Sequence, residues 1–375
     1  MSVKHFGGID LHSNNVVLVI IDQYKRWVFK RRMKNDLSVI LEGLGDFRDS
    51  LVGIVVESTY NWYWVVDGLM DNSYKMHLAH PVETSPKSRK KYSDDYRDAF
   101  NLADLLRQGE LHEGYIYPKE DRPLRDLLRK RGMLVKSRAK YLQNLGNFVN
   151  QQLGIQFKGY DVKTLGLVEF DQMFVDELLR LSGRSNLAVI KTLNLEISKL
   201  EKAILEKGKL KEEFHALLAI PGIGNIIALA ISLETGAINR FPDGGDYVSY
   251  SRCAPGGMWS NEKKKGEGNR KNGNKYLDWA YTEAANFTIR RCPYAKAYFD
   301  KKLKRTGERI VAIKSVAGKL ARGVYCILTR GVKYDPEKLF GVHKVATPVR
   351  KPKKTYKGVA SGSKPKRGLG KKPTV

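Results

Sequence analysis

Four acidic side chains in the first hundred residues have the types and spacing of a divalent-cation site. Asp10 lies inside one apolar, β-prone run, and Glu57 ends another. Asp is uncommon in strands and rarely buried unless it is paired or holds a metal. Hard cations take oxygen ligands, and two such ions can clamp both reacting oxygens of a phosphoryl transfer. We therefore expect a two-Mg²⁺ site at Asp10, Glu57, Asp95 and Asp98.

Simpler explanations compete at single residues of this group. An Asp such as Asp10 can cap a turn through its own backbone. The helix dipole favours acids in a first turn, which accounts for Asp94 or Asp95 and less well for Asp98. Asp94 is also the alternative third acid. His12 is either a polar residue at the end of a strand or a contact to substrate.

The elements that must position these acids alternate between strands and helices. Gly7 and Gly8, beside Asp10, mark a close approach of another backbone or a ligand. A hairpin followed by alternating helices and strands is typical of a mixed α/β sheet with crossover connections. The patterns predict strands over 3–11, 15–22, 24–31, 51–57 and 75–79, and helices over 36–49, 61–71 and from Ser93 or Asp94 onward.

Helical patterns dominate the rest of the chain. Residues 122–155 and roughly 187–207 predict a helical hairpin or a subunit contact, because the second pattern has a short a/d seam. Residues 214–236 form two apolar helices joined through Gly222 and Gly224, which resembles a helix-hairpin-helix motif. Free N–H groups at the start of its second helix can bind a phosphate oxygen. The alternative is an ordinary αα-hairpin.

The middle of residues 247–280 is a basic segment rich in Gly and Asn. A last helical pattern follows over 276–330. We expect the basic segment to be a loop that wraps a phosphate backbone. Ser260 stands at its head, and Ser249 and Ser251 lie nearby, where serine is common without chemistry. The cations expected to contact the phosphates are Lys263, Lys264, Lys265, Arg270 and Lys271.

The charge balance points to a polyanionic partner. The net charge is +27, from 67 Lys+Arg against 40 Asp+Glu, and residues 341–375 carry 11 Lys/Arg without an acid. Residues 1–340 therefore keep +16, so the body is basic as well as the tail. Nucleic acid is the first candidate and an anionic membrane surface the second. The Pro/Lys/Gly-rich tail is expected to stay disordered until it meets nucleic acid.

Other classes are excluded by the apolar runs and the cysteines. No apolar run approaches the length that spans a bilayer, and the N-terminus lacks the apolar core of a signal peptide. The three cysteines, Cys253, Cys292 and Cys326, form no spaced pair and no metal-ligand pattern. We expect reduced thiols in a cytosolic protein.

Several of these motifs together resemble a known family. The order of Gly8-Ile9-Asp10-Leu11-His12, Val56-Glu57-Ser58-Thr59 and Asp95-Tyr96-Arg97-Asp98-Ala99 is similar to the RuvC-like Asp-Glu-Asp-Asp domain of the insertion sequence 110 transposases. A second group of motifs is similar to the C-terminal domain of that family. These motifs are Ile220-Pro221-Gly222-Ile223-Gly224, Phe241-Pro242, and Ser260 with the block 271–277. The resemblance covers roughly residues 3–290.

The resemblance implies a fold class and an organisation into domains. It implies an α/β RNase H/RuvC-like catalytic domain over 1–115 and a helical, coiled-coil-like linker over 116–210. A mostly α transposase domain with a helix-hairpin-helix and the catalytic serine is implied over 211–335. A basic, disordered tail is expected over 336–375.

The resemblance also implies an activity and partners. The protein would cut and rejoin donor and target DNA through a phosphoserine at Ser260, with Mg²⁺ on the four acids and a structured bridge RNA as guide. It would act as a homo-oligomer, a dimer or tetramer, near the nucleoid in a prokaryotic cytoplasm, with no membrane partner. The chain departs from the family pattern at Asn261, where glycine is common, and in the Tyr-Ser-Asp lead to Asp95, where Lys-Thr is usual.

Two other functions fit the same residues. One is a Mg²⁺-dependent RuvC-like junction endonuclease in which water is the nucleophile and Ser260 is incidental. The other is a non-catalytic nucleic-acid-binding protein. Four neighbouring acids without a metal would repel one another for no gain, which weighs against the binding protein.

Overall fold

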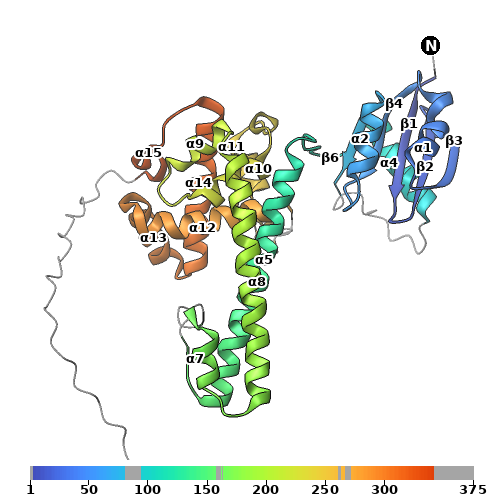
Figure 1. Cartoon of the computed structure of the whole chain (residues 1–375). Helices are drawn as coiled ribbons and strands as arrows, with labels where there is room; N and C mark the ends of the chain where they lie inside the picture. Colours follow the sequence, from blue (N-terminus) through green and yellow to red (C-terminus); the bar gives the residue numbers. More distant parts are fainter. Residues whose placement is uncertain are drawn as a thin grey trace, which may run out of the picture.

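The N-terminal part of the chain is a six-stranded mixed sheet with helices on both faces. The computed structural model describes residues 3–80, 94–157, 162, 164–260, 263–266 and 272–341 (Figure 1). The strand order is β3-β2-β1-β4-β5-β6, in which β1, β2 and β3 are antiparallel neighbours and β4 and β5 run parallel to β1. The strands are β1 His5–Leu11, β2 Asn15–Asp22, β3 Trp27–Lys34, β4 Leu51–Glu57, β5 Met76–Ala79 and β6 Glu113–Gly114.

Side chains on the sheet alternate between its two helical layers. Ile9 and Leu11 pack into a core under α1 (Leu37–Leu44) and α2 (Tyr63–Asp71). Phe6 belongs to the opposite core, under α4 (Asp95–Gln108). Because successive side chains of a strand face opposite sides, Asp10 faces the α4 layer with Phe6. A 3₁₀ turn, Gly45–Phe47, links α1 to β4.

Helix α4 approaches the sheet most closely at Gly8. A Cβ built on Gly8 would lie 1.9 Å from the carbonyl oxygen of Ala99 and 2.9 Å from the backbone nitrogen of Ala103. Only glycine therefore permits this helix to lie on β1. The close backbone approach expected from Gly7 and Gly8 is confirmed at Gly8, with a helix as the partner.

The expected mixed sheet is confirmed, with two corrections. The third strand was expected over 24–31 but spans Trp27–Lys34. Its start is delayed by a turn in which the carboxylate of Asp22 accepts hydrogen bonds from the N–H groups of Tyr24 and Arg26. The two-residue strand β6 pairs antiparallel with β5 and was not expected.

Two 32-residue helices form the predicted helical hairpin. Helices α5 (Arg122–Leu153) and α8 (Glu177–Gly208) run side by side (Figure 1). They are antiparallel, because Arg131 binds Glu201 while Arg138, further along α5, binds Asn194, earlier in α8. Helix α8 begins about ten residues before the expected start, and at Gly183 it leaves space for Phe170 of α7 (Leu167–Gln172).

The C-terminal part is a bundle of helices around its own core. Buried residues of α10, α12 and α14 form most of that core. The expectation of a mostly helical C-terminal part is confirmed. The elements are α9 Glu212–Leu218, α10 Asn225–Thr235, the 3₁₀ helix Ile238–Arg240, α11 Gly244–Tyr250, β7 Met258–Ser260, β8 Lys263–Gly266, α12 Lys275–Arg291, α13 Pro293–Thr306, α14 Arg309–Arg330 and α15 Pro336–Phe340.

Two C-terminal segments differ from expectation. Residues 263–266, expected in a loop, form strand β8, which pairs antiparallel with β7. The start of the expected disordered tail forms α15, because Phe340 is buried in the core beside Tyr298. Residues 342–375 lie outside the described residues. Within the described part of the chain, no helix has the length and apolarity needed to cross a membrane.

The sheet and the helices meet at the start of α5. The guanidinium of Arg122 stacks on Trp62 and donates hydrogen bonds to both carboxylate oxygens of Asp67 in α2, at 2.7 Å. Nearby, the Tyr117 hydroxyl donates to the carbonyl oxygen of Glu234 in α10. These contacts tie the first helical layer of the sheet to the bundle.

Replacing Gly8 by Ala tests the contact between α4 and β1. We expect Gly8→Ala to lower the free energy of unfolding by about 1–3 kcal/mol or more, because the added methyl group meets backbone atoms rather than a flexible side chain. Chemical denaturation measures the loss. Gly45→Ala is the matched control, since nothing lies within 4 Å of its added Cβ. Equal stability of the two variants would contradict the close packing.

Candidate functional site

The pairing of β1 with β4 brings two of the predicted acids to one edge of the sheet. The strands are parallel, and Ile9 is the register partner of Val56. Asp10 and Glu57 are the next residues along each strand, so they lie on neighbouring strands at the same end. Both face the α4 layer, because Ile9 and Val56 belong to the opposite core.

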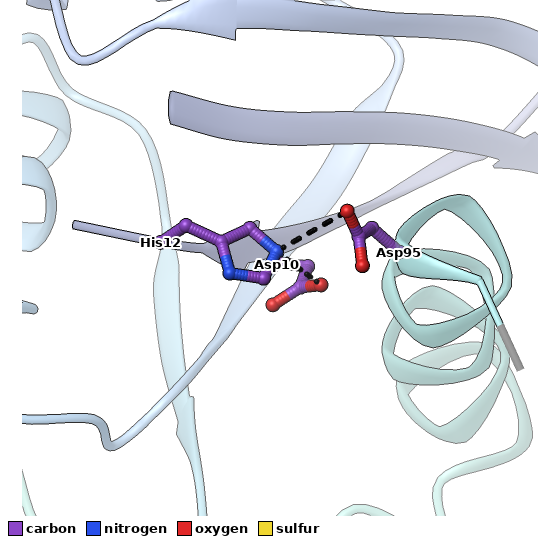
Figure 2. A group of neighbouring side chains, drawn as sticks. All are labelled: Asp10, His12 and Asp95. Atoms are coloured by element: carbon purple, nitrogen blue, oxygen red, sulfur yellow. Dashed lines mark ion pairs between the residues drawn. The ribbon is translucent and has the colours of Figure 1, made fainter. Parts of the chain in front are cut away.

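The first turn of α4 supplies the other two acids. Asp94 is the N-cap, and its carboxylate accepts a hydrogen bond from the N–H of Arg97 at 2.8 Å. Asp95, the first residue of the helix, lies instead beside Asp10 and His12 (Figure 2). Asp98 follows one turn later on an exposed position. The geometry therefore favours Asp95 over Asp94 as the third acid.

Three side chains form the tight centre of the site. Asp10, His12 and Asp95 each offer one ligand atom, and these atoms all lie within 4.8 Å of one another. The Nε2 atom of His12 is 3.2 Å from Oδ2 of Asp10 and 3.5 Å from Oδ2 of Asp95 (Figure 2). Glu57 and Asp98 flank this centre and are not part of it. The signal for the histidine was its position two residues after Asp10, directly after β1 ends at Leu11.

The surroundings of Asp10 disfavour its ionised form. Burial raises the pKa of Asp10 above its usual value, the negative charges of Asp95 and Asp98 raise this pKa further, and His12 opposes them. Asp95 is compensated separately, because its Oδ2 accepts a 2.6 Å hydrogen bond from Nη2 of Arg32. Repulsion between neighbouring carboxylates is what a bound cation relieves.

The residues fit a divalent cation on chemical grounds. Carboxylate oxygens from separate elements converge, and Nε2 of His12 lies among them, 3.2 Å from Oδ2 of Asp10. Ionised carboxylates and a neutral imidazole are metal ligands. When bound, the cation would neutralise the acids and polarise a phosphoryl oxygen.

The predicted nucleic-acid contacts lie on the C-terminal bundle. Gly222 has a φ of 107°, and a Cβ there would lie 2.5 Å from the backbone nitrogen of Thr288, so this glycine serves close packing. Gly224 caps the exposed start of α10. Lys263, Lys264 and Lys265 lie on β8, whereas Arg270 and Lys271 lie outside the described residues.

The predicted nucleophile Ser260 is the last residue of β7, and its register partner is Lys263. The hairpin follows α11 and precedes α12, both in the bundle, whereas Asp10 lies in the sheet. Ser260 and the acids therefore come from different parts of the chain. The two parts contact each other where Arg122, at the start of α5, meets Trp62 and Asp67. Ser249, expected in a loop, lies in α11.

A buried carboxylate in the bundle was missed by the sequence reasoning. Glu234 is 1% exposed, and its carboxylate accepts hydrogen bonds from Arg129 at 2.6 and 2.7 Å and from Nδ2 of Asn274 at 2.8 Å. These partners lower the pKa of Glu234 against the effect of burial. Asn274 also caps α12, directly after the basic segment. The signal was an acid within an otherwise apolar helix.

Comparisons with known proteins agree with this arrangement. Residues 7–152 match a family model that is named for the DEDD domain of IS110 and described as "Transposase". Residues 214–300 match a second model, described as "Transposase IS116/IS110/IS902 family". A "Probable family 20 transposase" of Pseudomonas aeruginosa is 25% identical over 151 residues, which are 39% of this chain and 44% of that relative. The alignment thus spans less than half of either protein.

The two family models match separate parts of the chain, one on the sheet with the first half of the helical hairpin and one on the bundle. The chain therefore belongs to the IS110 family of transposases.

Proposed function

We propose that this transposase cuts and rejoins DNA through a phosphoserine at Ser260, with a divalent cation, Mg²⁺ in the first instance, held by Asp10, Glu57, Asp95 and Asp98. The observation that carries the proposal is the convergence of Asp10 and Asp95, from β1 and α4, within 4.8 Å together with His12. An RNase H/RuvC-like assignment of the sheet domain is part of the proposal. The order β3-β2-β1-β4-β5 supports it, as does the helix packed on β1.

The reaction balances without an external energy source. The Oγ atom of Ser260 attacks the scissile phosphorus, a P–Oγ bond forms, and the bond from phosphorus to the departing sugar oxygen breaks. The serine proton is lost, and the departing oxygen becomes a hydroxyl. A sugar hydroxyl from the other DNA strand end later attacks the phosphoserine, which restores both Ser260 and a phosphodiester. Free serine is a weak nucleophile and needs activation, which the acidic site is proposed to provide.

We also propose an oligomer. Asp10 lies in β1 of the sheet and Ser260 in β7 of the bundle, so the acids of one subunit would serve the serine of another in a dimer or tetramer. The exposed start of α10 and the cations of β8 would hold the DNA backbone, with the α9–α10 turn acting as a helix-hairpin-helix. The domain limits at 115, 210 and 335 are part of this proposal.

A guide RNA is proposed as the second nucleic acid. Its support is the family resemblance, together with a net charge of +27 that exceeds what the tail supplies. Basic side chains would hold RNA and DNA alike by their phosphates, while base pairing would give the sequence information. We place the protein at the nucleoid in a prokaryotic cytoplasm for the same reason.

Replacing Ser260 by Ala separates the recombinase from the hydrolytic junction endonuclease. With element-end DNA, the RNA transcribed beside the gene and Mg²⁺, the wild-type protein should form a covalent protein–DNA adduct that survives denaturation in a gel. We expect the adduct to disappear in Ser260→Ala and in Asp10→Asn. Ser249→Ala is the matched control and should keep it. Unchanged cleavage without an adduct in Ser260→Ala would establish water as the nucleophile.

Replacing Asp10 by Asn tests the proposed cation site by stability. Folding raises the pKa of Asp10 above its usual value of 3.8. Protonated Asp10 therefore favours the folded state, and this contribution to the free energy of unfolding is lost as the pH rises through the raised pKa. In EDTA at neutral pH, Asp10→Asn should therefore unfold at a higher temperature than the wild type. Added Mg²⁺ should then stabilise the wild type more than the variant.

The control for this measurement is Asp36→Asn. Hydrogen bonds from Ser38 lower the pKa of Asp36, so ionised Asp36 favours the folded state and its loss should not raise the unfolding temperature. A lower unfolding temperature for Asp10→Asn than for the wild type in EDTA would show that ionised Asp10 is not disfavoured in the fold.

A further inference from the structure

His12 lies where a ligand to a cation at the acidic site would lie. Its Nε2 atom stands between a carboxylate oxygen from β1 and one from the start of α4 (Figure 2). That nitrogen is buried, and its nearest partners are Oδ2 of Asp10 at 3.2 Å and Oδ2 of Asp95 at 3.5 Å. The two acids nearest to it are those proposed to hold the cation.

The backbone of His12 is fixed from three directions. Its N–H donates to the carbonyl oxygen of Asn15 at 2.9 Å, which closes the β1–β2 hairpin. Its carbonyl oxygen accepts hydrogen bonds from Nδ2 of Asn35 at 3.1 Å and from Nδ2 of Asn61 at 3.0 Å. Those two amides follow β3 and β4. Such outer contacts are typical of residues whose position matters to a site.

From this placement we infer that Nε2 of His12 is a ligand in the same cation site as Asp10 and Asp95. An imidazole beside two carboxylates gives the site a mixed nitrogen and oxygen donor set. Mg²⁺ takes oxygen ligands, whereas imidazole suits first-row transition ions. Beside Mg²⁺, the site should therefore also accept a divalent first-row transition ion, with Mn²⁺ as the probe. This inference rests on the proposed function for the existence of a cation at these acids.

Arg32 also contacts Asp95. Its guanidinium donates to Oδ2 of Asp95, the same oxygen that faces His12. Arg32 comes from β3 and lies in register with Asp10 across β2, because both pair with Val17. A cation bound to Asp95 would replace that positive charge. Ion binding is thus an exchange of Arg32 for a metal at one oxygen.

Pulsed electron paramagnetic resonance of Mn²⁺ on the full-length protein tests the inference without relying on activity. A histidine ligand gives nitrogen modulation of the Mn²⁺ echo, and growth on ¹⁵N-labelled histidine should change its frequencies with no substitution at all. We expect the modulation to vanish in His12→Asn. His112→Asn, an exposed histidine of the same sheet domain, is the matched control and should keep it.

Calorimetric titration of the same proteins gives the affinities. We expect His12→Asn to bind Mn²⁺ about tenfold more weakly than the wild type, which is the lower end of the loss in metal affinity when a contact of a metal site is removed. The affinity for Mg²⁺ should change much less. Mn²⁺ binding that depends on Asp10 but shows no nitrogen modulation in the wild type would overturn the role of His12 and leave the proposed function intact. Absence of any ion binding that depends on Asp10 would overturn both.

Discussion

The contact between α4 and β1 at Gly8 is the constraint on which the acidic site depends. With no side chain at Gly8, the backbone of Ala99 comes within the space of a missing Cβ. The first turn of α4 is thereby held above the end of β1, where Asp10 lies. Since β1 and β4 are parallel, Glu57 arrives at the same edge. One small residue thus sets the distance between acids more than eighty positions apart in the chain.

The acidic site lies in a protein with a large positive net charge. A chain with a net charge of +27 brings Asp10 and Asp95 together at one place, where Asp10 has a raised pKa. Arg32 and His12 contact these two acids and offset part of their repulsion. In the proposed function, the net positive charge attracts nucleic acid, while the acidic centre would repel it until a cation is bound. Productive contact with nucleic acid would then depend on the cation.

The bundle contains a buried charge network of its own, centred on Glu234. Glu234 is buried and saturated by Arg125, Arg129 and Asn274, so it fixes the start of α5 and the start of α12 on one carboxylate. A buried ion pair adds little net stability, but removing one partner is costly. Asn274, the N-cap of α12, belongs to this network. The network therefore fixes the point at which α12 begins.

The sequence alone determined the mixed sheet and the long helices, because alternation and helical periodicity report directly on burial. It could not place the start of β3, which depends on the hydrogen bonds that the carboxylate of Asp22 accepts from backbone N–H groups. Nor could it decide between Asp94 and Asp95, because that depends on the hydrogen bond by which Asp94 caps α4. The strand β8 was missed because a run of lysines carries no apolar pattern, and the network at Glu234 because partners far apart in sequence create it. Which residues form the centre of the site, with His12 inside it, was decided by tertiary packing: the docking of α4 on Gly8 sets which side chains share one space.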